Sequence, residues 1–261
     1  MKRRVESPES AARRIFGKRA ARYTTSKPHA DPAVLAKVAE LTRADSNSSA
    51  LDIGTGSGHT AFAVAEAGAS VVGLDLTPKM LEEARRIRQK KGVGGVALIL
   101  GDAHALPFPN GAFQAVTCRR TAHHFSNITE ALREMHRVLC PRGKLVIDDR
   151  SVPEDDFVDK LMNELDTYHD GSHIRQYRSS EWQSMLHASG FGIDTLQTYT
   201  QLRNISSHTK GVEAKAVQKI LEMISNLDED QRIKLNFVRK QGQTYYNHWY
   251  ITVCAGKEAS S

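Results

Sequence analysis

Three carboxylates and a glycine-rich turn are the residues whose types and spacing most clearly suggest ligand binding. Segment 51–58 reads LDIGTGSG, so glycines alternate directly after a short apolar run. Glycine lets the backbone turn sharply and lets a ligand approach without a Cβ in the way. Asp52, Asp75 and Asp102 end or flank the first three apolar runs of this part of the chain. We therefore expect a binding site where these runs end.

The charges around this turn favour a cationic ligand. The turn contains no Lys or Arg, and an acid-rich mouth would repel a pyrophosphate. A dinucleotide fingerprint would also need glycine at position 59, where His59 stands. Asp75 lies 21 residues after Gly54, about where an acid that binds a ribose is expected. S-adenosylmethionine carries a sulfonium, an ammonium and a carboxylate but no phosphate, so the pattern favours it over NAD or ATP. The alternative is that the acids only cap helices and loops.

A pair of histidines could supply acid–base chemistry. His123 and His124 follow the fourth apolar run, near the edge where parallel sheets bind ligands. Histidine titrates near neutral pH and suits a general base, so we predict that one of the two is catalytic. The alternative is that these rings cap a helix or bind backbone carbonyls. His29, His59 and His173 are further pocket candidates.

The sequence does not predict a metal site. Asp148 and Asp149 could form a metal pair, but adjacent side chains on a strand point to opposite faces. Cys118, Cys140 and Cys254 contain no close pair, which excludes a disulfide scaffold or a zinc ribbon and indicates a reducing compartment. No apolar run approaches the roughly 18 residues of a membrane helix, and no secretory signal is visible. We expect a cytoplasmic protein without a membrane span.

Strands that alternate with helices must position these residues. Apolar runs predict five strands, at 50–53, 71–74, 96–100, 113–118 and 144–147. Helical spacing and capping signals predict helices between them, which gives βαβ units and a parallel sheet covered on both faces. Two later strands, 192–199 and 244–254, could pair as an antiparallel edge.

Five stretches of sequence together resemble one family. They are LDIGTGSGHTA (51–61), VVGLDLTPKML (71–81), GDAHALPFPNGAF (101–113), RRTAHHF (119–125) and LREMHRVLCPRGKLVI (132–147). The chain resembles the class I S-adenosylmethionine-dependent methyltransferases over about residues 12–200, and more narrowly the group related to the ubiquinone/menaquinone C-methyltransferases. The resemblance implies an α/β, Rossmann-like, doubly wound seven-stranded sheet. That sheet would be mostly parallel with an antiparallel last strand and helices on both faces.

The resemblance also implies which residues hold S-adenosylmethionine, whose product is S-adenosylhomocysteine. The residues that would line its methionine part belong to the glycine turn: Gly54, Thr55, Gly56 and Gly58. Asp52 would anchor this turn near the ammonium, and Arg119 would lie beneath the methionyl group.

The resemblance further implies contacts to the adenosine part of the cofactor and a lid over it. Asp75 would take both ribose hydroxyls, and Leu76 would form an apolar wall along the adenine. Asp102 would contact the exocyclic amine, with the Ala103 backbone beside it. Such enzymes often close an N-terminal lid over the cofactor, and the residues that would belong to it are Tyr23 and Thr24.

A basic arm precedes the regular pattern. Residues 1–22 contain eight Lys or Arg and two acids, so they carry the whole formal net charge of +6. Because the rest of the chain is neutral, no basic docking face is visible and we do not expect a nucleic-acid partner. We expect residues 1–30 to form the arm and cofactor lid, and residues 31–261 to form the methyltransferase domain. Helical insertions near 153–189 and 205–240 would lie on the substrate side.

The function expected is methyl transfer to a small apolar or aromatic acceptor, such as a quinol-like or phenolic compound. Three alternatives stay open: an RNA methyltransferase that uses the basic arm, a non-catalytic protein that binds S-adenosylmethionine, and an NAD-dependent oxidoreductase. The sequence also leaves the oligomeric state open, with a homodimer as one option.

Overall fold

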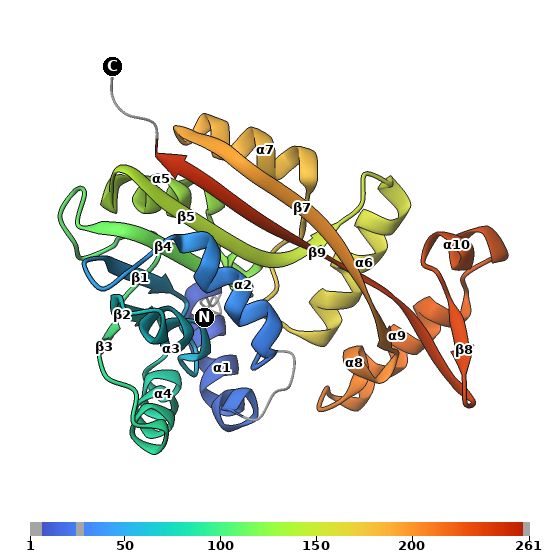
Figure 1. The fold of residues 1–261 in the computed structure, drawn as a ribbon. Coiled ribbons are helices and arrows are strands. Elements are labelled where there is room, and N and C mark those ends of the chain that lie inside the picture. Colours follow the sequence, from blue (N-terminus) through green and yellow to red (C-terminus); the bar gives the residue numbers. More distant parts are fainter. Residues whose placement is uncertain (1–6, 25–28, 258–261) are drawn as a thin grey trace, which may run out of the picture.

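The computed structural model describes residues 7–24 and 29–257, with the side chains of residues 22–24 left out. One mixed sheet runs through the molecule in the order β3-β2-β1-β4-β5-β9-β7 (Figure 1). The strands of this path are β1 (Ser49–Ile53), β2 (Ser70–Asp75), β3 (Val96–Leu100), β4 (Phe113–Arg119), β5 (Leu139–Val152), β7 (Phe191–Asn204) and β9 (Gln243–Lys257). The pairs among β1 to β5 are parallel, whereas β9 is antiparallel to both β5 and β7.

The predicted fold class is confirmed, but the predicted count of seven strands is too low. Two short strands, β6 (Tyr177–Arg178) and β8 (Val238–Lys240), pair with β5 and β9 and bring the sheet to nine strands. Runs of two or three residues are too short to show the alternation on which a strand prediction rests.

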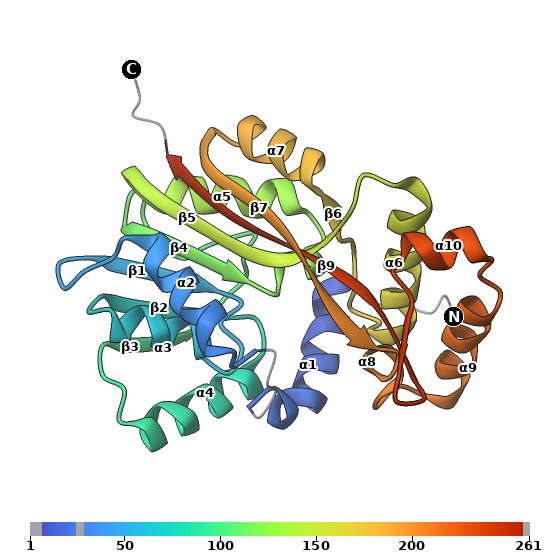
Figure 2. The ribbon, with the colours of Figure 1, turned by 45° about the vertical axis from the view of Figure 1, so that its right-hand side comes forward.

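Helices cover both faces of the parallel half of the sheet, as Figure 2 shows from a second side. The helices of the described residues are α1 (Pro8–Thr24), α2 (Pro32–Thr42), α3 (His59–Glu66), α4 (Pro78–Lys91), η1 (Ala122–His124), α5 (Ile128–Val138), α6 (Asp156–His169), α7 (Ser179–Ala188), α8 (Ser206–Thr209), α9 (Ala214–Ser225) and α10 (Glu229–Lys234). The alternation of strand side chains splits the core: Leu51 and Ile53 pack toward α5 and α7, while Ala50 packs toward α3 and α4. None of the helices in the described part of the chain is long and apolar enough to cross a membrane.

Capping signals in the sequence explain where two of these helices begin. Asp31 accepts hydrogen bonds from the backbone of Ala33 and Val34 at the start of α2, and Asn127 accepts one from Glu130 at the start of α5. Each side chain satisfies backbone N–H groups that lack partners inside the helix.

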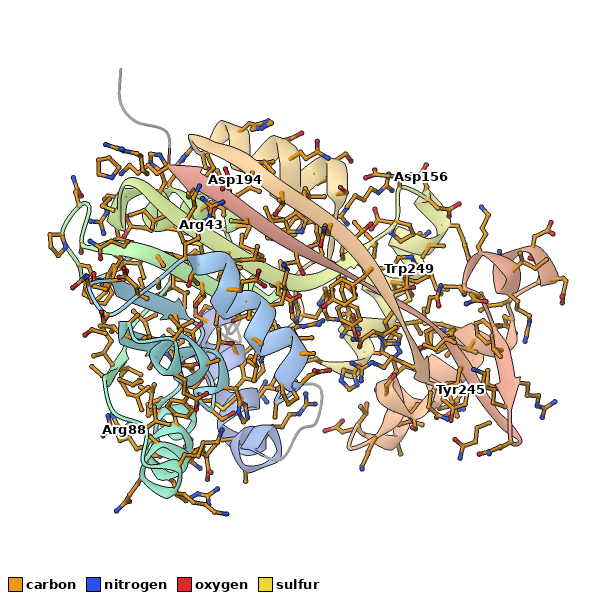
Figure 3. All side chains as sticks on the ribbon, viewed as in Figure 1. Arg43, Arg88, Asp156, Asp194, Tyr245 and Trp249 are labelled. Carbon is orange, nitrogen blue, oxygen red and sulfur yellow. The ribbon has the colours of Figure 1, made fainter. Side chains whose placement is uncertain are left out.

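A second apolar cluster lies at the far end of the long strands β7 and β9. It joins α6, α9 and the segment before β8 through Leu161, Ile220, Leu235 and Tyr246, with Trp249 packed against it. Figures 1 and 2 show this end projecting away from α3 and α4, and Figure 3 marks it with Tyr245 and Trp249 on β9. The molecule therefore has a parallel, nucleotide-binding type of half and a C-terminal half with a core of its own.

Candidate active site

A cavity of about 980 Å³, a volume that includes space open to solvent, lies at the carboxyl ends of β1, β2 and β4. Its walls come from the loops after β1 to β4 and from helix α1, which contributes Glu9, Ala12 and Phe16. In open parallel sheets, ligands bind at this edge, where the strand order reverses between β1 and β4.

The glycine turn forms the floor of this cavity. Gly54, Gly56 and Gly58 have positive φ angles of 63°, 54° and 88°, which only glycine adopts without strain. A Cβ added to Gly54 would lie 2.5 Å from the hydroxyl oxygen of Thr121. Gly54, Thr55 and Gly56 line the cavity, whereas Gly58 is absent from its lining and serves as the N-cap of α3.

Asp75 and Asp52 both hold the turn, but from different sides. Asp75 lines the cavity and accepts hydrogen bonds from the backbone of Gly56 and Thr77, each 2.8 Å long. Burial raises the pKa of Asp75. Asp52 lies behind the turn, outside the cavity lining, where the hydroxyls of Thr55 and Thr117 donate to it at 2.7 Å. Burial raises the pKa of Asp52 to about 6 against the effect of these two donors.

The predicted adenine contacts lie together at one end of the cavity. Leu76, Asp102 and Ala103 all line it. Asp102 accepts hydrogen bonds from the backbone N–H of His104 at 2.9 Å and contacts its ring Nδ1 at 2.7 Å. This pairing orients the carboxylate but leaves it with further acceptor positions.

Arg119 ends β4 and points its guanidinium into the opposite end of the cavity. Nε donates to the hydroxyl of Thr60 at 2.9 Å, and Nη2 donates to the backbone carbonyl of His29 at 2.5 Å. Nη1 is buried and has no hydrogen-bond partner among the residues that the structure describes. A buried guanidinium nitrogen without a partner is costly, so an anionic group of a ligand would stabilise this end of the site.

His123 forms a pair with a buried acid. Its backbone N–H and its ring Nδ1 lie 3.1 Å and 2.6 Å from the two carboxylate oxygens of Asp149, which is 0% exposed. Burial alone would raise the pKa of Asp149, but the charge and hydrogen bond of His123 lower it to about 2. The carboxylate is therefore ionised and accepts from Nδ1–H, so in the neutral ring the lone pair lies on Nε2.

His124 lies between this pair and the cavity. It lines the cavity, and its ring centroid is 4.0 Å from that of His123 and 4.9 Å from that of Phe16. Nδ1 lies 3.0 Å from the backbone carbonyl of Ser172. Burial, together with the neighbouring His123, lowers the pKa of His124 to about 3, so this ring is neutral at neutral pH.

The other histidine candidates divide into two groups. His29 and His59 line the cavity, and burial with the nearby Arg119 and Arg120 lowers the pKa of His29 to about 3. His173 lies outside the lining, where its Nε2 is 3.0 Å from the side-chain oxygen of Asn163.

Two predicted lid residues cannot be placed against this cavity. Tyr23 and Thr24 end helix α1, but their side chains lie outside the described residues. Their contact with the cofactor stays a prediction.

The adjacent acids on β5 point in opposite directions. Asp148 accepts from Tyr199 at 2.8 Å and from Thr252 at 3.0 Å, whereas Asp149 faces His123. Residues 7–24 and 29–257 contain no cluster of three or more His, Cys, Asp or Glu that could hold a metal ion.

Comparison with known proteins decides the family. The model of a methyltransferase domain matches residues 51–147. The chain is 34% identical over 219 residues to an uncharacterized methyltransferase of Bacillus subtilis, YcgJ. The aligned residues make up 83% of this chain and 87% of YcgJ. The chain belongs to the class I S-adenosylmethionine-dependent methyltransferases. The predicted family is confirmed.

Two further likenesses describe this methyltransferase. The crystal structure of YcgJ superposes with a TM-score of 0.82 at 31% identity, over 87% of this chain and 99% of that one. A demethylmenaquinone methyltransferase of Thermus thermophilus is 46% identical, but only over 99 residues, which are 37% of this chain and 44% of the relative. The chain thus spans less than half of that relative's length.

Sequence reasoning missed three groups that this methyltransferase places at the site. It treated Asp149 only as half of a metal pair, although an acid at the carboxyl end of the fifth strand was the available signal. It did not single out Phe16 or Ser172. Nothing in the local sequence of these two residues indicates a contact with His124, which lies more than 40 positions away from Ser172.

Proposed function

We propose that this protein transfers a methyl group from S-adenosylmethionine to a hydroxyl-bearing aromatic acceptor of quinol-like or phenolic type. The observation that carries this proposal is the buried His123–Asp149 pair beside a cavity that Arg119 also lines. Arg119 is suited to hold an amino-acid carboxylate, and the pair is suited to remove a proton.

The residues present fit the cofactor. The unpartnered Nη1 of Arg119 would pair with the methionyl carboxylate, and Asp75 retains acceptor positions for the ribose hydroxyls. Leu76 and Ala103 provide apolar surface for the adenine, with Asp102 at its edge. When bound, S-adenosylmethionine supplies the electrophilic methyl group, which the acceptor receives as the carbon–sulfur bond breaks.

The two histidines would have different roles toward the acceptor, one as a base and the other as a hydrogen-bond acceptor. His123 is the better base because the ionised Asp149 orients its ring and offsets the charge of the imidazolium. His123 does not line the cavity itself, so the acceptor proton would reach its Nε2 through one bridging water. His124 stays neutral and would accept a hydrogen bond from the acceptor.

The character of the cavity supports an aromatic acceptor with an acidic proton. Phe16 and Phe125 line it near His124, which gives flat apolar surface for a ring. Arg120 also lines the cavity, with its guanidinium 3.8 Å from the ring centroid of Tyr250. Arg120 is paired with Asp148 at 3.1 Å, and its positive charge would add to the stabilisation of a phenolate as the proton leaves. The demethylmenaquinone methyltransferase among the relatives points to the same class, at low coverage.

We further propose that residues 1–30 act as the lid and residues 31–261 as the catalytic domain, with the insertions on the acceptor side. Helix α1 forms one wall of the cavity, and α6 leads into the loop that contacts His124. This division supports a reaction between a core that holds the cofactor and later elements that hold the acceptor.

Replacement of the buried acid tests the proposed function. With labelled S-adenosylmethionine and a panel of quinols and phenols, Asp149→Asn should lower kcat by about 10²- to 10⁴-fold, the usual range for a general base. Its affinity for S-adenosylhomocysteine should stay within about threefold of wild type, because this change leaves the cofactor contacts intact. The side chain of Asp156 is 94% exposed in the wild-type protein. Asp156→Asn is therefore the matched control and should have wild-type activity and affinity. An Asp149→Asn protein with full turnover would contradict the proposed base.

A further inference from the structure

Helix α1 is tied to the loop after α6 by one arginine. Arg19 Nη1 lies 3.1 Å from a carboxylate oxygen of Asp170, and Nη2 donates to the backbone carbonyl of His169 at 3.3 Å. The side chains of Arg19 and Asp170 are 23% and 10% exposed, so water screens this pair less than an ordinary surface pair. The wall of the cavity and the loop are therefore joined at a defined point.

The same aspartate sets the position of Ser172. The other carboxylate oxygen of Asp170 accepts from the backbone N–H of Ser172 at 3.0 Å and from its hydroxyl at 2.7 Å. These two bonds fix the orientation of Ser172, whose backbone carbonyl lies 3.0 Å from Nδ1 of His124.

This contact determines where His124 carries its proton. The carbonyl oxygen of Ser172 only accepts, and the hydroxyl of Ser172, 3.2 Å from the same Nδ1, gives its proton to Asp170. Nδ1 therefore donates, and Nε2 holds the lone pair. Among the residues that the structure describes, none forms a hydrogen bond with Nε2 of His124. Because His124 lines the cavity, Nε2 is the nitrogen available to a bound molecule.

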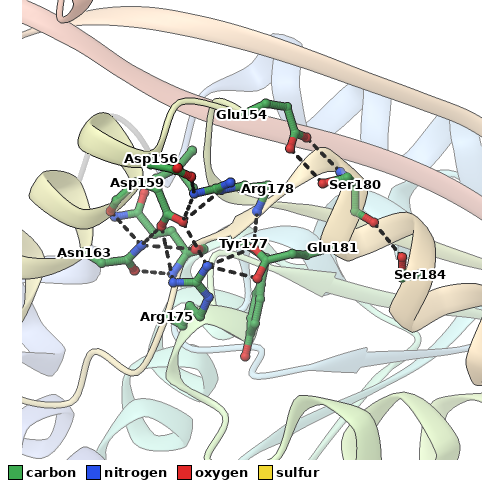
Figure 4. Close-up of polar contacts among 12 residues, drawn as sticks. Glu154, Asp156, Asp159, Asn163, Arg175, Tyr177, Arg178, Ser180, Glu181 and Ser184 are labelled. Atoms are coloured by element: carbon green, nitrogen blue, oxygen red, sulfur yellow. Dashed lines mark hydrogen bonds and ion pairs between the residues drawn. The ribbon is translucent and has the colours of Figure 1, made fainter.

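The far end of this loop is fixed independently of α1. The side-chain oxygen of Asn163 on α6 accepts from the backbone N–H of Gln176 at 2.7 Å. Asp159, one turn earlier on α6, accepts from Arg175 at 3.0 Å and from Arg178 at 2.9 Å, as the dashed lines in Figure 4 show. Backbone bonds hold the loop on both sides of Ser172, since the N–H of Asp170 donates to the carbonyl of Asp166 at 2.7 Å and the N–H of Ile174 donates to that of His123 at 2.9 Å. The side chain of Asp170 is therefore the contact through which α1 reaches Ser172.

We propose that Arg19 and Asp170 are positioning residues that act through Ser172 to hold His124 as its Nδ1–H tautomer when helix α1 is seated. The inference rests on the proposed function, since it makes Nε2 of His124 the hydrogen-bond acceptor for the hydroxyl of the methyl acceptor. Seating of α1 would then do two things: it would complete the wall of the cavity and set the acceptor site. Without this ionic contact, the carboxylate of Asp170 would lose the partner that fixes its orientation toward the hydroxyl of Ser172. That hydroxyl could then donate to Nδ1 of His124, and the ring would exchange its proton between both nitrogens.

The tautomer can be read directly by NMR of protein labelled with ¹⁵N in histidine, with His124→Gln used to assign the ring signals. In the wild-type protein, Nδ1 should resonate as a protonated nitrogen and Nε2 as an unprotonated one. In Arg19→Met and in Asp170→Asn, the Nε2 signal should shift toward that of a protonated nitrogen. Arg19→Lys keeps the charge beside Asp170 and should keep most of the wild-type tautomer.

The matched control is Arg13→Met, which removes the same charge from an exposed position on the same helix and should leave the His124 signals unchanged. If Asp170→Asn does not fold, the tautomer of His124 in Arg19→Met alone tests the inference. Arg19 is the more exposed partner of the pair, so its replacement should disturb folding less. Wild-type signals of His124 in a folded Arg19→Met protein would overturn the inference.

The measurement needs neither cofactor nor acceptor, so its failure is distinct from failure of the proposed function. Absence of S-adenosylhomocysteine binding by the wild-type protein would contradict the proposed function but leave the tautomer shift as evidence for the positioning pair. Cofactor binding without any tautomer shift would contradict the positioning pair alone.

Discussion

The two halves of the molecule are built in different ways. In the half that we propose holds the cofactor, the key contacts are local or made by the backbone: Asp75 holds Gly56 and Thr77, and Asp52 holds Thr55. In the C-terminal half, which we propose as the acceptor half, buried charged groups meet across long stretches of chain. Asp166 of α6, for example, contacts a residue of β5 16 positions before it and a histidine of α8 42 positions after it. The first half depends on a short motif, whereas the second depends on the tertiary fold that brings distant charges together.

This difference predicts where a single replacement most strongly lowers the free energy of unfolding. Asp166 is 1% exposed and lies 3.0 Å from Nη1 of Arg150 and 2.8 Å from Nε2 of His208. Asp166→Ala should lower the free energy of unfolding by about 3–5 kcal/mol, because it leaves the charge of Arg150 buried without its partner. Denaturant titration followed by circular dichroism measures this change.

An exposed ion pair of the same half serves as the control. Asp156, 94% exposed, pairs with Arg178 at 2.6 Å. Asp156→Ala should change the free energy of unfolding by no more than about 1 kcal/mol. Equal stability losses in Asp166→Ala and Asp156→Ala would show that the buried network is not what holds the C-terminal half together.

The acceptor half should also make stability depend on pH. Burial lowers the pKa of His173 to about 4 and the pKa of His248 well below its usual value, with His208 and Arg150 opposing the charge of His248. Between about pH 6.5 and 4, the unfolded chain binds protons that the folded chain does not, so stability falls as the pH falls through this range. Each such group contributes about 1.4 kcal/mol per pH unit.

Unfolding titrations at pH 7.5, 6.5 and 5.5 check this prediction. His248→Gln should flatten the dependence, whereas His187→Gln, at an exposed position on α7, should leave it as in the wild-type protein. A free energy of unfolding that stays constant from pH 7.5 to 5.5 would mean that the buried histidines are already charged in the folded state.

The cofactor half could be predicted largely from the sequence. The glycine turn, the acids at strand ends and the alternation of strands with helices are all patterns that can be read from short stretches of sequence. The lining of the cavity by Gly54, Asp75, Asp102 and Arg119 matches the positions at which the sequence predicted ligand contacts. Asp52 and Gly58 were predicted from the same motif but lie outside the lining of the cavity. Asp52 belongs to strand β1 and lies behind the turn, and Gly58 caps helix α3.

The acceptor half could be predicted only in part. The helix at 156–169 and the two long strands follow from apolar spacing. The partner of His123 did not, since Asp149 and His123 are 26 positions apart and only the packing of β4 beside β5 brings them together. The contact between Arg19 and Asp170 spans 151 positions and leaves no periodic signal.

We propose that the cavity holds S-adenosylmethionine through the acids at the ends of the strands. Calorimetric titration with S-adenosylhomocysteine and with NAD, on the wild-type protein and on Asp75→Ala, measures this binding. The wild-type protein should bind S-adenosylhomocysteine with micromolar-range affinity and should not bind NAD. Asp75→Ala should bind S-adenosylhomocysteine more than about tenfold more weakly, since hydrogen bonds to a carboxylate are worth about 1.5–3 kcal/mol. Tighter binding of NAD, or an unchanged affinity in Asp75→Ala, would show that these acids do not hold the cofactor.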